Sequence, residues 1–188
     1  MNLISDHSYR NTTLAQAAFA LAESKPDALA IRFDNGKTLT YHQAWTRGLQ
    51  LAAALQASGL QPGDTLSFQL PNSEESVVVA IGASICGLVI NPIVPIYRGR
   101  ELAFILRDAR AKVAFIPGVY RKFDFPAMLE ELKNDLPELT QVICVGAEGA
   151  LPDGFQHFEA FMAEASGETA KLAAVSPDDT KILLYTSG

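Results

Sequence analysis

Residues 72–92 read Asn72-Ser-Glu-Glu-Ser-Val-Val-Val-Ala-Ile-Gly-Ala-Ser-Ile-Cys-Gly-Leu-Val-Ile-Asn-Pro92, which places a helical pattern directly before a strand pattern. Asn72 is predicted to cap the helix, and Glu75 three residues later completes a capping box. The helix is apolar nearly all round over residues 77–86, so we expect other elements to cover both of its sides. Gly87 ends it, and residues 88–90 follow as a short buried strand. A buried helix that leads straight into a buried strand is typical of an α/β protein.

The same alternation extends in both directions along the chain. Thr13 with Gln16, and Thr40 with Gln43, each form a capping box at the start of a predicted helix. Further helices are predicted at residues 100–109, 124–132 and 157–165, and strands at residues 65–70, 112–116, 141–145 and 181–185. Because these strands are apolar throughout, we predict an α/β fold with a mostly parallel sheet and helices on both faces. Residues 1–188 are expected to form one partial domain.

Composition and charge exclude several classes of protein. The chain of 188 residues is 48% apolar and has a formal net charge of −6, which argues against general phosphate contacts to a nucleic acid. Residues 76–97 carry no charge, but glycines and prolines interrupt them, so no membrane span is expected. Cys86 and Cys144 match no metal or redox spacing. A reduced, cytoplasmic protein is therefore expected.

Most enzyme signatures are missing from the sequence. The chain has neither a dinucleotide fingerprint nor a complete P-loop pattern. Ser84 is a near miss to a nucleophile elbow, but Cys86 stands where that motif needs glycine, so Ser84 is predicted to be a packed small residue. The histidines His7, His42 and His157 have no ligand spacing and are interpreted as surface or cap residues.

Positive charge is concentrated in residues 98–122, which contain seven basic and two acidic residues. One hypothesis is that Arg98 and Arg100 form part of a landing site for a polyphosphate ligand. The alternative, which we favour, is a solvated face balanced by acidic residues elsewhere in the fold.

The last eight residues, Lys181-Ile-Leu-Leu-Tyr-Thr-Ser-Gly188, carry the strongest chemical indication. Hydroxyl residues and a glycine directly after a buried strand suit a loop that cradles phosphate, because glycine lets backbone N–H groups turn toward an anion. Ligands bind beyond the carboxyl ends of strands in open α/β sheets. No covering helix follows this strand, so we expect the sequence to be an N-terminal piece of a longer chain.

The order of these segments resembles the N-terminal part of the AMP-forming acyl-CoA synthetases, within the adenylate-forming superfamily. The matching motifs are Leu39-Thr-Tyr41, Gly59-Leu-Gln-Pro-Gly-Asp64, Leu70-Pro-Asn72, Gly87-Leu-Val-Ile-Asn-Pro92 and Tyr97-Arg-Gly-Arg-Glu-Leu102. Tyr185-Thr-Ser-Gly188 is similar to the opening of that family's phosphate loop, which typically continues Thr-Thr-Gly-x-x-Lys. The sequence of residues 91–97 is most similar to that of ligases for small or medium carboxylic acids, such as cyclohexanecarboxylate.

This resemblance implies a two-step ligase that uses ATP, Mg²⁺ and coenzyme A. A carboxylate attacks the α-phosphate of ATP and releases pyrophosphate, and the coenzyme A thiol then displaces AMP from the acyl-adenylate. The resemblance assigns the start of the ATP phosphate loop to Thr186, Ser187 and Gly188, and places the catalytic and metal-binding residues downstream. We therefore expect the 188-residue chain alone to be inactive in adenylation.

Other functions remain open from the sequence. The chain is compatible with a non-catalytic binding or assembly module built on the same lobe, or with an amino-acid adenylation domain. The residues do not identify the carboxylic acid. An uncovered terminal strand would also favour self-association of the isolated chain.

Overall fold

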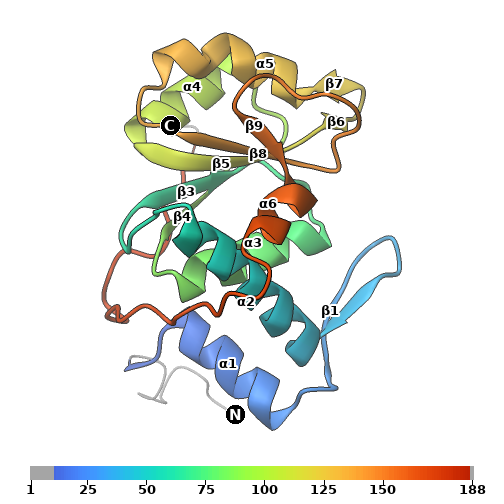
Figure 1. Ribbon diagram of the computed structural model, residues 1–188, viewed down its shortest axis with the longest axis vertical. Helices are drawn as coiled ribbons and strands as arrows, with labels where there is room; N and C mark the ends of the chain where they lie inside the picture. Colours follow the sequence, from blue (N-terminus) through green and yellow to red (C-terminus); the bar gives the residue numbers. More distant parts are fainter. Residues whose placement is uncertain (1–10, 187–188) are drawn as a thin grey trace.

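A five-stranded sheet forms the centre of the molecule (Figure 1). The computed structural model describes residues 11–186. All neighbouring strands are parallel, which confirms the predicted α/β class. In spatial order the strands are β4 (Val89–Pro92), β3 (Thr65–Phe68), β5 (Ala111–Pro117), β8 (Gln141–Val145) and β9 (Phe155–His157).

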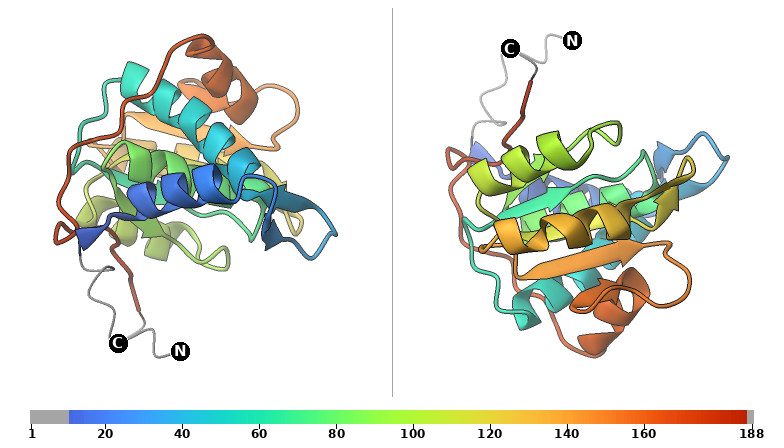
Figure 2. Two further views of the ribbon diagram at one scale, coloured as in Figure 1. Left: turned by 90° about the horizontal axis from the view of Figure 1, so that it is seen from below. Right: turned by 90° about the horizontal axis from the view of Figure 1, so that it is seen from above.

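Helices cover both faces of this sheet, as the sequence predicted (Figure 2). Strand β5 shows the division, because Val113 and Phe115 belong to one hydrophobic cluster and Ala114 and Ile116 to another. The first face carries α2 (Tyr41–Ala57), α3 (Glu74–Ile85) and α6 (Phe158–Glu164). The second face carries α4 (Gly99–Asp108) and α5 (Phe125–Leu132), which leads into the short 3-10 helix η2 (Lys133–Asp135). Helix α1 (Leu14–Ser24) packs outside α2 and α3.

Both threonine caps lie where the sequence placed them. The Thr13 hydroxyl accepts from the Gln16 amide at 3.2 Å, and the Gln16 side chain accepts from the Thr13 amide at 2.9 Å. Thr40 and Gln43 form the same reciprocal pair at the start of α2. Each pair satisfies donors that the first turn of a helix leaves unpaired, which explains where these helices begin.

The predicted cap of α3 is wrong by one residue. Ser73, not Asn72, is the N-cap, and its hydroxyl accepts from the Ser76 amide. Ser76 completes the box in place of Glu75, because its hydroxyl accepts from the Ser73 amide and donates to the Ser73 carbonyl. A short hydroxyl side chain closes this box locally, while Glu74 and Glu75 lie in the first turn, where the helix dipole favours negative charge.

Helices α2 and α3 approach closely at two glycines. A Cβ atom on Gly48 would lie 2.3 Å from Cγ2 of Ile81, and one on Gly82 would lie 3.0 Å from the Leu51 side chain. Because glycine has no side chain, the two backbones approach closely at these positions, and α3 is buried against α2. The contact confirms the expectation that α3 is covered on more than its sheet side.

Several short strands were not predicted from the sequence. One antiparallel hairpin joins β1 (Leu29–Arg32) and β2 (Thr38–Thr40), and another joins β6 (Val119–Tyr120) and β7 (Phe123–Asp124). Strand β9 is also only three residues long. Such segments are too short to show a hydrophobic period, so pattern analysis does not detect them.

The predicted strand at residues 181–185 is largely wrong. Only Ile182 pairs with the sheet, through an isolated parallel bridge to Ile90 of β4. Ile182 is 49% exposed and Leu184 is 69% exposed, so the segment is not buried. The segment then leaves the sheet on the side of α4 (Figure 2), where Tyr185 contacts Asp108 and Phe104 of that helix.

Candidate functional site

Of the predicted phosphate-loop residues, Thr186 lies at the end of the described segment at residues 181–186, which borders β4. Two backbone bonds fix its first part, from the Ile90 amide to the Lys181 carbonyl and from the Leu183 amide to the Ile90 carbonyl, each at 2.9 Å. Thr186 is exposed, which leaves its hydroxyl accessible to a ligand. Ser187 and Gly188 lie outside the described residues. The structure therefore places one of the three predicted site residues.

Asn91 ties this segment to the interior of the sheet. Its side chain is fully buried, the Ser67 hydroxyl donates to its Oδ1 at 2.8 Å, and its Nδ2 donates to the Leu183 carbonyl at 3.0 Å. This chain of bonds crosses from β3 through β4 to the segment. It satisfies polar groups that would be costly to bury alone, and it sets where the segment leaves the sheet.

A second buried amide holds the loop that follows β4. Gln69 comes directly after β3, is 1% exposed, and its Nε2 donates to the carbonyls of Val94 and Tyr97 at 3.0 Å each. The loop lies at the carboxyl end of the sheet, where α/β proteins bind their ligands. Sequence analysis missed both amides, although polar residues within apolar strands were the available signal.

Tyr185 anchors the segment on α4. Its hydroxyl donates to Oδ2 of Asp108 at 2.6 Å, and its ring meets that of Phe104 edge-on at 6.2 Å between centroids. Burial, followed by the bond to the Asp108 carboxylate, raises the pKa of Tyr185 to about 12. The phenol therefore keeps its proton and continues to donate across the physiological range.

The positively charged segment is largely engaged within the fold. The Arg98 guanidinium donates to the carbonyls of Pro95 and Tyr97 at 2.9 Å each, and lies 4.1 Å from the centre of the Phe123 ring. Arg107 donates to the Asp135 carbonyl, and Arg110 forms an ion pair with Glu138 at 2.8 Å. These contacts support a structural role for the arginines over a polyphosphate site. Arg100 is exposed.

We predict that Arg98→Ala lowers the free energy of unfolding by about 1–2 kcal/mol, because it removes two hydrogen bonds and a ring contact. Both arginines are exposed, and Arg100→Ala, two residues away and without these contacts, serves as the matched control and should change it by less than about 0.5 kcal/mol. Urea denaturation of both variants measures the difference. Equal effects of the two substitutions would contradict the structural role of Arg98.

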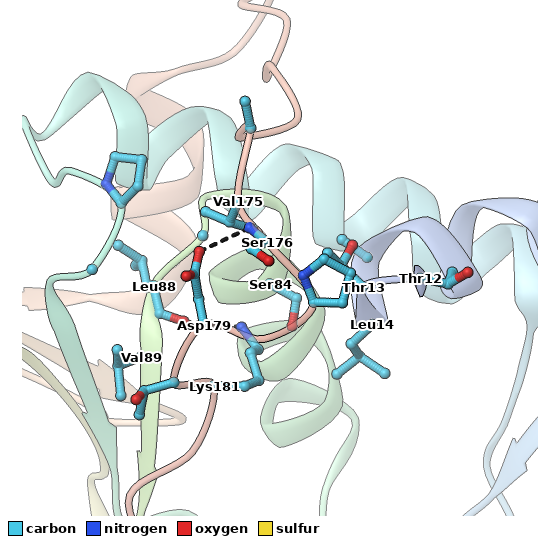
Figure 3. A pocket seen from close by; sticks show the side chains of 17 residues that line it. Thr12, Thr13, Leu14, Ser84, Leu88, Val89, Val175, Ser176, Asp179 and Lys181 are labelled. Carbon is cyan, nitrogen blue, oxygen red and sulfur yellow. Dashed lines mark hydrogen bonds between the residues drawn. The ribbon is translucent and has the colours of Figure 1, made fainter. Parts of the chain in front are cut away.

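A cavity of about 510 Å³ lies at the opposite end of β4 from the predicted phosphate loop (Figure 3). It is bounded by the start of α1, the turn after α3, and residues 174–181. Lys181 points into it and donates from Nζ to the Leu88 carbonyl at 2.9 Å. Burial lowers the pKa of Lys181 to about 8 from 10.5.

This lowered pKa gives Lys181 a defined effect on stability. Below pH 8 the folded protein carries a partly buried charge that the unfolded chain exposes to water, so the ammonium destabilises the fold. As the pH rises from 8 to 10.5 the folded state loses this proton first, and the penalty disappears. We expect Lys181→Met to be more stable than the native protein by about 1–2 kcal/mol at pH 7, allowing for partial exposure. The advantage should shrink by pH 10, and denaturant titration at both pH values tests it; a pH-independent difference would contradict it.

Other candidate groups carry no site in the described part of the chain. Ser84 is buried and donates to the Ala80 carbonyl inside α3, which confirms its packing role. His42 lies in the first turn of α2, His157 occupies the N-cap of α6, and His7 is outside the described residues. Within residues 11–186 no cluster of three His, Cys, Asp or Glu side chains could hold a metal ion. No helix in that range is long and apolar enough to cross a membrane.

The sequence and the fold are both similar to those of known proteins. The family model described as AMP-binding enzyme matches residues 18–188. The 3-[(3aS,4S,7aS)-7a-methyl-1,5-dioxo-octahydro-1H-inden-4-yl]propanoyl:CoA ligase of Rhodococcus jostii is 33% identical over an alignment of 162 residues, which covers 82% of this chain and 31% of that protein. The long-chain-fatty-acid–CoA ligase of Bacillus subtilis is 30% identical over an alignment of 201 residues, which covers 95% of this chain and 35% of that protein.

A solved structure is similar to this chain in fold. The anthranilate CoA ligase AuaEII, crystallised with anthranoyl-AMP, superposes with a TM-score of 0.79 over 95% of this chain and 33% of its own, at 23% identity. This chain spans about a third of the length of the curated relatives it matches. The family model covers nearly the whole sequence. The chain belongs to the AMP-binding enzyme family.

Proposed function

We propose that this chain is the N-terminal lobe of an ATP-dependent carboxylate–CoA ligase and carries the start of its ATP phosphate loop at Thr186, Ser187 and Gly188. The family match over residues 18–188 carries the proposal. The CoA-ligase names of both curated relatives support the ligase class, and the exposure of Thr186 fits a loop residue. Residues 1–188 would then form one partial domain of a cytoplasmic enzyme.

The chemistry of this class makes a poor electrophile reactive in two steps. In the first, a carboxylate oxygen attacks the α-phosphorus of ATP, the bond to the pyrophosphate oxygen breaks, and an acyl-adenylate forms. In the second, the coenzyme A thiol attacks the acyl carbon, AMP leaves with the bonding electrons, and the thiol proton passes to solvent. Donors placed around the phosphates stabilise the charge that develops during the first step.

The described residues do not by themselves complete a site for these substrates. Of the predicted loop they contain only the Thr186 hydroxyl, and within them no side-chain cluster fits Mg²⁺. Mg²⁺ is therefore proposed only for the whole ligase, held by residues outside the described range. The role of the lobe is to position the segment that begins the loop.

We predict that the 188-residue chain alone gives no carboxylate-dependent exchange of labelled pyrophosphate into ATP. The same chain extended by its downstream sequence should give exchange with at least one member of a panel of short, medium and aromatic carboxylates. The assay is run on both proteins at equal concentration, with the blank lacking carboxylate. Exchange above the blank by the 188-residue chain would show that the lobe is catalytic on its own.

A further inference from the structure

Lys181 is an unusual lysine within residues 11–186. The salt bridges of that range include Lys112 but not Lys181, whose polar contact is the Leu88 carbonyl. Apolar side chains of Leu14, Leu88 and Val89 line the same cavity. A partly buried ammonium without a carboxylate partner is unfavourable, so this environment promotes the neutral amine.

The neighbouring titratable groups do not reverse this preference. Cys86, at the end of α3, is kept protonated because burial raises its pKa to about 12, so it offers no negative charge near neutral pH. Asp179 lines the cavity from the 174–181 side, but its Oδ2 accepts from the Ser176 amide at 2.8 Å. With a pKa of about 8, roughly a tenth of Lys181 is neutral at pH 7, against well under a thousandth of an ordinary lysine.

We propose that Lys181 is an acylation site, at which the ε-amine takes an acyl group from an acyl thioester and directs it into the adjoining cavity. The amine lone pair attacks the thioester carbonyl carbon, the carbon–sulfur bond breaks, and the thiolate leaves and takes up the proton that the nitrogen loses. The product is an amide and a free thiol, so no oxidant or further reactant is needed.

The cavity gives this site its selectivity. Its volume of about 510 Å³ lies within the roughly 300–1,000 Å³ of ligand pockets, and its walls combine apolar side chains with hydroxyl groups. An acyl chain attached to Lys181 would lie against Leu14, Leu88 and Val175. The amide N–H can still donate to the Leu88 carbonyl, so acylation removes a charge without removing that bond.

The consequence for the protein follows from where Lys181 lies. It begins the segment that leads through Leu183 and Tyr185 to Thr186. An acyl chain bound in the cavity would add contacts to the start of this segment, which two backbone bonds already hold against β4. Acyl thioesters are the products of the proposed ligase, so the physiological meaning of the site depends on the proposed function, although its chemistry does not.

Acylation is tested by supplying the thioester directly. The purified protein is incubated with acetyl-CoA or octanoyl-CoA at pH 7.5, and the acylation of each lysine is followed by mass spectrometry of chymotryptic peptides. Lys171, an exposed lysine ten residues earlier, is the internal control. We expect Lys181 to be acylated at least about tenfold faster than Lys171, because a substantial fraction of Lys181 is neutral and this outweighs its partial burial.

Two further observations distinguish an enhanced reactivity of Lys181 from labelling that depends on exposure alone. The rate at Lys181 should level off above pH 8, where its amine is already neutral. Lys181→Arg, which keeps the charge, should abolish labelling of its peptide and leave the rate at Lys171 unchanged. Labelling of Lys181 no faster than that of Lys171, or without a plateau, would overturn the proposal. Because the donor is supplied, this result does not depend on the pyrophosphate-exchange assay.

Discussion

Replacing Gly48 with valine is expected to lower the free energy of unfolding by about 3 kcal/mol. A Cβ atom at this position would lie 2.3 Å from Cγ2 and 2.9 Å from Cβ of Ile81, and neither atom belongs to a flexible side-chain end. Valine adds two methyl groups to this contact, so α2 and α3 must move apart and lose packing along their shared face. Urea denaturation followed by circular dichroism measures the loss.

The matched control replaces Ile81, the residue that obstructs a larger side chain at position 48. Ile81→Ala creates space opposite Gly48, so the double variant Gly48→Val with Ile81→Ala should recover at least about 1 kcal/mol relative to the sum of the two single effects. A Gly48→Val protein as stable as the native one would show that the close helix contact does not hold α3 in place.

Asn91→Leu is expected to destabilise the protein by about 3 kcal/mol and to release the segment at residues 181–186. Leucine has nearly the same shape as asparagine, but it leaves the Ser67 hydroxyl and the Leu183 carbonyl without their partner. Each buried polar group left unpaired costs about 1–3 kcal/mol. Hydrogen exchange should become faster at the amides of Ile90 and Leu183, which bond to this segment and to β4.

Ser67→Ala separates the two ends of this network. It removes the bond to Oδ1 of Asn91 but keeps the bond from Asn91 to Leu183, so it should destabilise the fold by about 1 kcal/mol. It should also leave exchange at residues 181–186 unchanged. Equal acceleration in both variants would show that Asn91 does not anchor the segment.

The sequence alone predicted the main architecture because its signals are local and strong. Reciprocal bonds at Thr13 and Thr40 define where two helices start, and apolar runs at residues 112–116 and 141–145 mark two central strands. These signals need no tertiary information. The motifs that carry the family resemblance are also contiguous in the sequence, several of them at the turns between these elements, which is why the family was identifiable before the structure.

What the sequence did not predict depends on long-range contacts. The apolar run at residues 181–185 has a strand composition, but its pairing is set by the edge of β4, Asn91 and Tyr185, which lie on different elements. The cavity beside Lys181 likewise brings together residues far apart in the chain. The lowered pKa of Lys181 comes mainly from burial, which residues far apart in the chain create, so no local pattern marked it.

The structure explains how this part of an AMP-binding enzyme holds its terminal segment. Two helical layers fix the sheet, Asn91 binds the segment to β4, and Tyr185 binds it to α4. Thr186 then lies beyond these anchors and is exposed. The arrangement supports the proposal that residues 186–188 begin a phosphate loop.

The most direct test of this account is the sequence of the source reading frame immediately after the codon for Gly188. The account predicts a continuation similar to Thr-Thr-Gly-x-x-Lys, followed by several hundred further residues, because the chain spans about a third of its curated relatives. A stop codon, or a continuation that lacks the glycine and the lysine, would contradict the proposal that this chain carries the start of an ATP phosphate loop.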